Sequence, residues 1–219
     1  MAEIDHGKYL DIPDDVDADW AARRRLAAAL TRLTEACVVG DLTAEPLDRA
    51  AEQVEALVRS LGDRTRTASQ AFADGSYHTQ PAHWIDRSAL VGRCNPVAPP
   101  MFFAFEEGRS IATCTLGHRH GGAPGIAHGG IVAAAFDQVM GHCATMHGVG
   151  GLTTTLTVRF KRRTPLQEPL RFEAWLAQKV GPYATFEAAS FAGDRPLGTA
   201  TGVFKILKAG QAEHLFAGR

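Results

Sequence analysis

Residues 128–144 read HGGIVAAAFDQVMGHCA and carry the strongest structural signal in the chain. After the glycine pair its only polar side chains are Asp137, Gln138 and His142, and this composition predicts a helix that is buried nearly all round. A carboxylate in such a helix is costly unless something uses it or a partner neutralises it. Because no Lys or Arg occurs over 122–157, a local salt bridge is excluded, and a functional role is favoured over a distant ion pair.

The helix face that carries Asp137 is lined with small side chains. Positions three, four or seven residues from Asp137 share its face. They are Gly130, Ala133, Ala134, Met140, Gly141 and Ala144. Because five of the six are Gly or Ala, another backbone or a ligand can approach closely, and we expect the carboxylate to stand at a crevice.

The beginning of this helix favours negative charge, because free backbone N–H groups and the helix dipole both attract it there. Gly129 and Gly130 place no side chain in front of these groups, so the segment is a candidate oxyanion hole, although a Gly pair before a helix is often only a tight turn. Gly129 and Asp137 lie about 12 Å apart along the axis at ~1.5 Å per residue. Since one small carbonyl cannot contact both, we predict a homodimer in which each site takes Asp137 from the second chain.

Strand-like runs surround the helix along the chain. Two precede it, at 101–106 and 109–116, and four follow it, at 152–160, 170–180, 183–191 and 197–207. Consecutive runs are joined by short loops, which indicates antiparallel pairing because parallel neighbours need a long crossover. The order of elements therefore predicts an α+β fold with a curled antiparallel sheet wrapped around one central helix.

The N-terminal region predicts a helical hairpin extension. A helix capped by Asp19 and stopped by Gly40 precedes a second helix that is capped by Thr43 and stopped by Gly62. One face of the hairpin is apolar and holds no constellation of nucleophile, base or metal ligands. This pattern favours a packing accessory or an interaction surface over a catalytic role.

Composition excludes several classes of protein. The chain has 219 residues, 45% of them hydrophobic, and a net charge of −1, which indicates a globular protein with no basic surface for nucleic acid. No apolar run approaches the roughly 20 residues of a membrane-spanning helix, and the acidic N-terminal region is unlike a signal peptide, so we expect no membrane span and a cytoplasmic location. The four cysteines lack paired spacing and are expected to be reduced and mostly packed. No metal site is expected, because His118 and His120 lack an acidic or Cys partner.

Several of these features occur together in one known family. The run GIAHGG at 125–130, the acid Asp137, Thr153 sixteen residues later and the basic run at 158–165 resemble the hot-dog fold acyl-CoA thioesterases of the PaaI group, most closely the branch with a Pro-Gly before the HGG triplet. The resemblance implies a hot-dog fold, a homodimer or a dimer of dimers, no cofactor, and hydrolysis of a thioester between an acyl group and coenzyme A.

A domain division follows from the resemblance and the element order. We expect an N-terminal helical extension and linker over 1–90, the hot-dog thioesterase domain over 91–208 and a C-terminal tail over 209–219.

The resemblance also implies roles for the residues that match. Gly129 donates its N–H to the thioester oxygen, and Asp137 acts as general base or as nucleophile. Thr153, on the next strand, helps to place water, and Gly130 borders the substrate.

Basic residues follow the same strand. Arg159, Lys161, Arg162 and Arg163 could bind the phosphates of coenzyme A, or could be ordinary solvated side chains at a strand exit.

Two positions depart from the family pattern. Some relatives carry Asn or Gln six residues before the His, where this chain has Gly122, so His128 or a backbone donor is left to compensate. Strand alternation groups Thr153 with the polar Thr155 and Thr157, away from the apolar face, unless a twist or bulge reassigns it.

Two rival functions use the same fold. One is a non-catalytic acyl-CoA-binding or lipid-binding dimer, which would not need the acid and the glycine. The other is a hydratase or dehydratase, which would pair a His base with the carboxylate. His142 lies roughly 140° round the helix from Asp137 and is poorly placed for that pairing.

Overall fold

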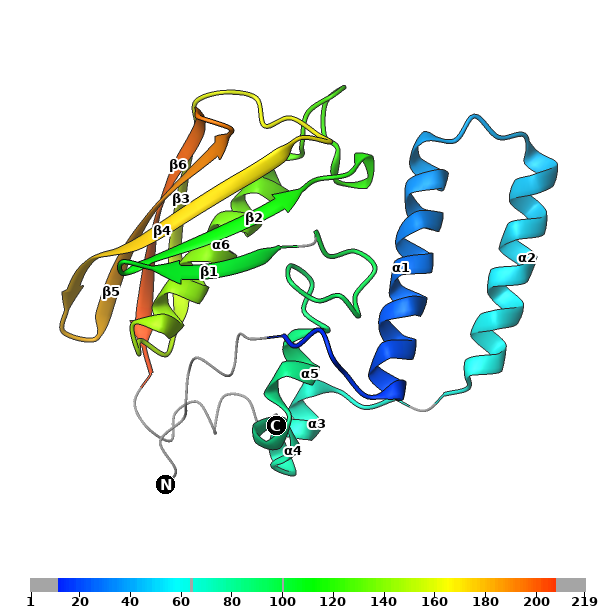
Figure 1. Cartoon of the computed structure of the whole chain (residues 1–219), viewed down its shortest axis with the longest axis horizontal. Helices are drawn as coiled ribbons and strands as arrows, with labels where there is room; N and C mark the ends of the chain where they lie inside the picture. Colours follow the sequence, from blue (N-terminus) through cyan, green and yellow to red (C-terminus); the bar gives the residue numbers. More distant parts are fainter. Residues whose placement is uncertain (1–11, 64, 100, 208–219) are drawn as a thin grey trace.

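The structure, a computed structural model, describes residues 12–63, 65–99 and 101–207. Its main feature is a six-stranded antiparallel sheet in the order β1-β2-β4-β5-β6-β3 (Figure 1). The strands are β1 (Phe102–Glu106), β2 (Arg109–Thr115), β3 (Gly151–Phe160), β4 (Pro169–Val180), β5 (Tyr183–Ala192) and β6 (Arg195–Ile206). All six predicted strands are confirmed within one or two residues at each end. The predicted tail at 209–219 lies outside the described residues, and the predicted domain boundaries stay a prediction.

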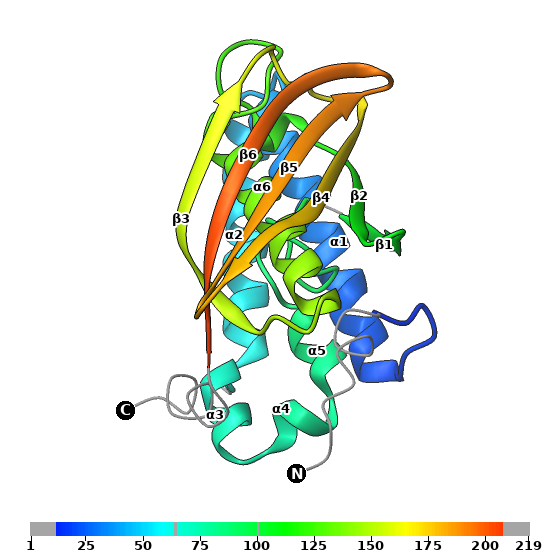
Figure 2. The same cartoon turned by 90° about the vertical axis from the view of Figure 1, so that its left-hand side faces the viewer.

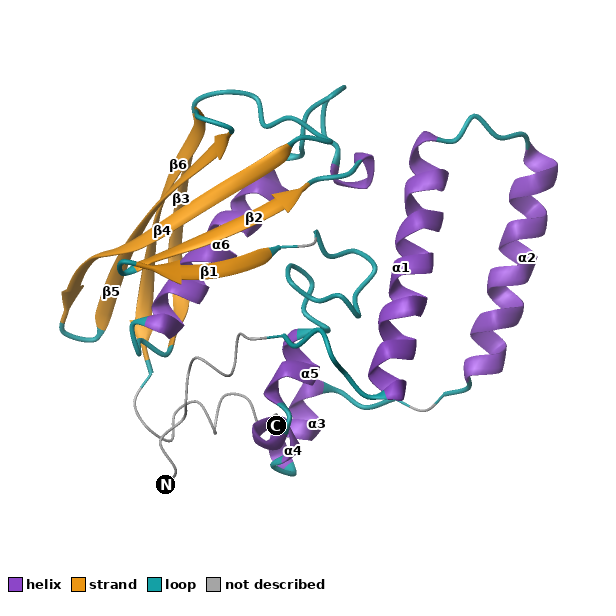
Figure 3. Cartoon of the chain, viewed as in Figure 1, coloured by secondary structure: helices purple, strands orange, loops and turns teal. Residues whose placement is uncertain are grey.

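The sheet curls around one long helix, α6 (Gly129–Met146), which the sequence predicted (Figure 3). The helix side that meets the sheet is fully buried and includes Phe136, Val139, Met140 and Cys143. Close packing depends on a glycine in β6, because a Cβ at Gly202 would lie 3.0 Å from the Met140 Sδ and Cε atoms. The core is therefore the space between α6 and the concave face of the sheet.

The expectation that α6 is buried nearly all round is wrong. The sheet covers one side of the helix only, so Ala133, Ala134, Asp137 and Gly141 on the other side are half-buried. A Cβ added at Gly141 would meet nothing within 4 Å. The part of the small-residue face at 133, 134 and 141 is therefore partly open, whereas Met140 and Ala144, which were expected on the same face, are buried.

The N-terminal hairpin consists of α1 (Ala18–Val39) and α2 (Ala44–Leu61). Asp17, and not Asp19, caps α1, because its side chain accepts the Trp20 N–H at 2.8 Å. Figure 2 shows the hairpin on the side of α6 that faces away from the sheet. No residue of α2 is buried, so its apolar face is open.

The predicted linker contains three short helices and an irregular loop. The helices are α3 (Ala68–Ala73), α4 (Ser76–Thr79) and α5 (Pro81–Ile85). A loop after α5 lies between α1 and the sheet–helix unit (Figure 1).

Three of the four unpaired cysteines are packed as expected. Cys114 and Cys143 are buried and Cys94 is half-buried, whereas Cys37 is exposed at the end of α1. In the part of the chain that the structure describes, no helix is long and apolar enough to cross a membrane. Within the same residues, no three His, Cys, Asp or Glu side chains lie together as they would around a metal ion.

Candidate active site

The beginning of α6 presents a free backbone donor. His128 is the N-cap residue, with φ −64° and ψ 133°, and its Nδ1 accepts the Gly130 N–H at 3.0 Å. Among the described residues no acceptor contacts the N–H of Gly129, which is exposed. Since Nδ1 is an acceptor, a neutral His128 ring carries its proton on Nε2 and can donate from there. The predicted oxyanion donor is therefore available, whereas the Gly130 N–H is already used.

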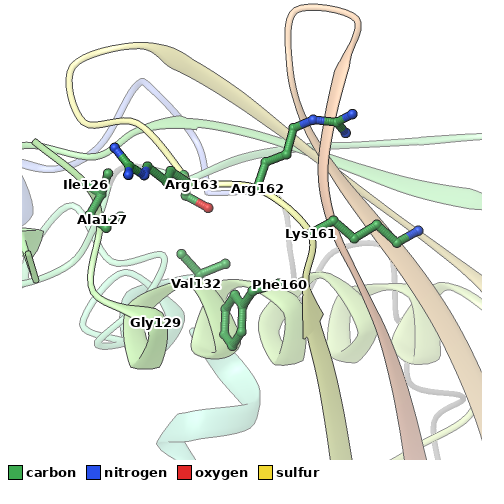
Figure 4. Close-up of a pocket in the computed structure, with 9 residues that line it drawn as sticks. Ile126, Ala127, Gly129, Val132, Phe160, Lys161, Arg162 and Arg163 are labelled. Atoms are coloured by element: carbon green, nitrogen blue, oxygen red, sulfur yellow. The ribbon is translucent and has the colours of Figure 1, made fainter.

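A pocket of about 430 Å³ opens directly in front of this N-terminus (Figure 4). It is lined by Ile126, Ala127, Gly129, Val132, Phe160, Lys161, Arg162, Arg163 and Thr164. The Phe160 ring closes one wall, because it lies 3.5 Å from the position of a Cβ on Gly129. The pocket thus combines an N–H donor, an apolar wall and three cationic residues.

Some of the predicted phosphate-binding residues line the pocket and one does not. Lys161 and Arg162 line the pocket, but their side chains point away from Gly129 in Figure 4, and the Arg162 guanidinium donates to the Pro196 carbonyl at 2.8 Å. Arg163 extends toward Ile126 in the same view. Arg159 does not line the pocket, because strand alternation directs it to the sheet face opposite Phe160. Positive charge at the pocket therefore comes from 161–163.

Asp137 and Thr153 are joined by a hydrogen bond. The Thr153 Oγ1 donates to the Asp137 Oδ1 at 2.8 Å, so Thr153 faces the helix. Strict alternation predicted the opposite face, and the reason for the difference is a register shift in the β3–β6 pairing between Thr153 and Thr155. The bulge at the strand start turns Thr153 toward the carboxylate.

These two halves of the site are separate within one chain. Gly129 and Phe160 border the pocket at the end of β3, whereas Asp137 and Thr153 lie near the beginning of β3 and do not line it. Within the described residues, the candidate oxyanion donor therefore borders this pocket and the carboxylate does not.

His142 is not part of this arrangement. Its Nδ1 lies 2.7 Å from Ser110 Oγ, and its ring stacks on Phe103 at a centroid distance of 4.6 Å. Burial lowers the pKa of His142 to about 4, so the ring is neutral at pH 7. Within one chain His142 therefore faces Ser110 and Phe103, in agreement with its predicted placement away from Asp137.

The segment that contains these residues is similar to a known family. Residues 124–199, which include the HGG triplet, Asp137 and Thr153, match the family described as "Thioesterase superfamily". This segment belongs to the thioesterase superfamily. The predicted hot-dog fold and the superfamily are thereby confirmed, and the free Gly129 N–H lies in the superfamily segment.

The chain is similar in structure to solved thioesterase proteins. The chain superposes on the crystal structure of protein RHA08564, a thioesterase superfamily protein, with a TM-score of 0.75 and 26% identity over 90% of this chain and 94% of that one. A hypothetical thioesterase with coenzyme A from Streptococcus pneumoniae TIGR4 superposes with a TM-score of 0.46 and 17% identity over 48% of this chain and 87% of that one.

A curated relative is similar over a shorter stretch. Acyl-coenzyme A thioesterase THEM5 from Mus musculus is 36% identical over 66 residues, which are 30% of this chain and 27% of that protein. The chain therefore matches about a quarter of the length of this relative.

Sequence reasoning missed Phe160 as a residue that borders the pocket. Phe160 was treated only as the last apolar position of its strand, whereas Arg163 belonged to the predicted phosphate-binding cluster. The position of Phe160 could have identified it, because it stands where β3 ends, beside the N-terminus of α6.

Proposed function

We propose that the protein hydrolyses acyl-CoA thioesters to a free acid and coenzyme A. The observation that carries this proposal is the unpartnered Gly129 N–H at the N-terminus of α6, in a pocket that also holds the basic residues 161–163. An oxyanion donor and cations in one pocket suit a substrate with a reactive carbonyl and several phosphates. The matched segment of the curated relative, which is named as an acyl-coenzyme A thioesterase, supports the same substrate class.

In the proposed reaction the thioester carbonyl accepts the Gly129 N–H at the positive end of the helix dipole. This interaction stabilises the negative charge that develops on the oxygen, and losing such a donor typically costs about 10²–10³ in rate. His128 Nε2–H is a second donor at the same helix end, and it would replace the side-chain amide that Gly122 cannot supply.

Asp137 then activates water or attacks the carbonyl directly, and it acts from a second copy of the chain. The Thr153 hydroxyl fixes the carboxylate rotamer through its 2.8 Å hydrogen bond and leaves the other oxygen for water or for the carbonyl. Thr153 is thus the residue that orients Asp137, in addition to the predicted role of placing water.

The edge position of β3 supports this shared site. β3 ends the sheet on one side, and an edge strand offers unpaired backbone groups to another chain. If two β3 strands pair antiparallel about a two-fold axis between Leu156 and Thr157, Thr153 of one chain lies opposite Phe160 of the other. That pairing brings the Asp137 end of one chain to the Gly129 end of its partner.

The assembly that we propose is accordingly a homodimer or a dimer of dimers. We also propose that it works in the cytoplasm, where its unpaired cysteines stay reduced.

A panel of acyl-CoA esters assayed for free thiol release tests the function. Wild-type protein should release thiol from at least one ester, and the Asp137→Asn variant should remain folded and lose at least about 10²-fold in kcat, as expected for a general base or a nucleophile. Binding of acyl-CoA without thiol release would favour a non-catalytic binding protein. Undiminished turnover in Asp137→Asn would remove Asp137 from the mechanism.

A further inference from the structure

The carboxylate of Glu35, in the N-terminal hairpin, accepts hydrogen bonds from the 117–121 loop, which leads into the candidate active site. Glu35 lies on α1, and its Oε1 accepts the His118 N–H at 2.6 Å. Its Oε2 accepts the Arg119 N–H at 3.2 Å and the Arg119 guanidinium at 3.4 Å. A Cβ on Gly117 would lie 2.9 Å from Oε2, so a larger residue at 117 would force the carboxylate to shift.

The same carboxylate also reaches the segment on the other side of the HGG triplet. Gln167 Nε2 donates to Glu35 Oε1 at 3.4 Å, and the Gln167 backbone N–H donates to the Leu116 carbonyl at 2.9 Å. Burial alone would raise the pKa of Glu35, but the His118 and Arg119 donors outweigh it and hold the pKa below its usual value. The charged form of Glu35 is therefore the one that the loop binds.

These two segments hold the residues directly before α6. The His120 carbonyl accepts the His128 N–H at 2.9 Å, and the Thr164 carbonyl accepts the Ala127 N–H at 2.9 Å. Ring Nδ1 of the buried His120 accepts the Gly117 N–H at 3.1 Å, which makes the loop a compact unit. Glu35 is thus linked to the N-cap residue His128 through its hydrogen bonds to His118 and Arg119, the backbone of 118–120, and the hydrogen bond between the His120 carbonyl and the His128 N–H.

Helix α1 can serve as a support because it is itself anchored. The Asp86 carboxylate is fully buried and accepts hydrogen bonds from the Trp20 indole at 2.5 Å, the Arg24 guanidinium at 2.8 Å and the Arg93 N–H at 2.7 Å. Burial alone would raise the pKa of Asp86, but these donors and the Cys94 thiol lower it more. Nearer to Glu35, the Thr31 hydroxyl donates to the Pro96 carbonyl at 3.0 Å.

We propose that Glu35 is a positioning residue for the oxyanion donor Gly129. Through Glu35, the N-terminal hairpin would contribute to the geometry of the active site. The inference rests on the proposed function. Glu35 does not contact the substrate pocket, and it acts by holding the 117–121 loop and through it the start of α6. Because the Gly129 hydrogen bond strengthens in the transition state, a shift of this N–H should lower kcat more than it changes KM.

The test compares Glu35→Ala and Glu35→Gln with Glu55→Gln, which alters a glutamate on α2 that is 69% exposed. We expect kcat of Glu35→Ala to fall about 10- to 100-fold with KM changed less than about twofold, a smaller fall in Glu35→Gln, which keeps one acceptor oxygen, and no change in Glu55→Gln. An unchanged kcat, or a change confined to KM, would overturn the inference.

Amide hydrogen exchange gives a second measurement that needs no activity. Both Glu35 variants should speed exchange at His118, at Arg119 and also at His128, whose N–H is held by the His120 carbonyl. Faster exchange at His118 and Arg119 with unchanged exchange at His128 would show a local role only and would overturn the inference. If the wild-type protein releases no thiol from any ester, the proposed function fails, and the exchange at His128 still decides whether Glu35 positions the helix start.

Discussion

Gly129 occupies a position where the backbone N–H can be removed without disturbing the helix. It is the first residue of α6, and proline is well tolerated at this position because no intrahelical acceptor awaits its N–H. The preceding residue, His128, has the extended conformation (φ −64°, ψ 133°) that a following proline requires. We therefore expect Gly129→Pro to fold like the wild type and to lose about 10²–10³ in kcat for acyl-CoA hydrolysis.

The matched control is Gly129→Ala, which keeps the N–H. Its new Cβ would lie 3.5 Å from the Phe160 ring, an ordinary contact, so this variant should retain most of the wild-type kcat. Circular dichroism and thermal unfolding of both variants establish that the folds are intact. Equal losses in the two variants would show that the space in front of Gly129 matters and its N–H does not.

Single residues also show where sequence reasoning reaches its limit. Asp137 could be predicted because a carboxylate in an apolar helix is unusual whatever its neighbours are. The orientation of Thr153 could not, because a bulge shifts the alternation by one residue and leaves no mark in the pattern of threonines. Only the resemblance of the HGG and Asp137 motifs to a known family made Thr153 a candidate.

Among the elements, the strands and helices could be predicted well because each has a simple period and clear boundaries. The alternation of Leu156, Val158 and Phe160 identified β3, and Gly40 and Gly62 end α1 and α2 as expected. The burial of α6 was overestimated, since an apolar composition shows what a helix can bury and not which elements cover it. The half-buried face of α6 is the one that carries Asp137. The overestimated burial and the proposed role of Asp137 therefore both depend on this partly open face.

The buried His142 of α6, which contacts Ser110 of β2, makes the free energy of unfolding depend on pH. His142 is 5% exposed, and its folded pKa is about 4, below the usual 6.5 of the unfolded chain. Between these values the unfolded chain binds a proton that the folded chain does not, so this contribution to stability is complete above pH 6.5 and is lost as the pH falls toward 4. Between pH 6.5 and pH 4 the loss of unfolding free energy amounts to about 3 kcal/mol, at ~1.4 kcal/mol per pH unit.

Urea unfolding between pH 7 and pH 4.5 measures this contribution. In His142→Gln the free energy of unfolding should fall less steeply with acid than in the wild type, because the group that takes up the proton is absent. The variant His147→Gln makes the same substitution at an exposed histidine of the same segment and serves as the comparison. A parallel pH dependence in His142→Gln and the wild type would contradict the assignment.

The arrangement of the whole chain adds what no local pattern contains. Glu35 and His118 are 83 positions apart, and Trp20 and Asp86 are 66 apart, so neither contact is visible in a helical or strand period. The sequence predicted a hairpin with one apolar face, and the structure shows that no residue of α2 is buried. It did not predict that α1 would support the loop before the HGG triplet, because that depends on how two separate units pack.

The shared site can be tested by mixing two inactive proteins. Asp137→Asn lacks the acid, and Gly129→Pro lacks the oxyanion donor. If each site combines Gly129 of one chain with Asp137 of its partner, a mixed dimer holds one site with both defects and one intact site. Co-refolding equal amounts should make about half of the dimers mixed and restore about a quarter of the wild-type thiol release.

If both residues of a site came from one chain, every site in the mixed dimer would carry one defect, and the mixture would stay as inactive as its components. Subunit exchange is verified by tagging one variant and recovering the other with it. A control mixture of Asp137→Asn with wild type should show no gain above the wild-type share, because the defective acid then disables one site of each mixed dimer. Recovery of activity in the first mixture requires that Asp137 of one chain act together with Gly129 of another.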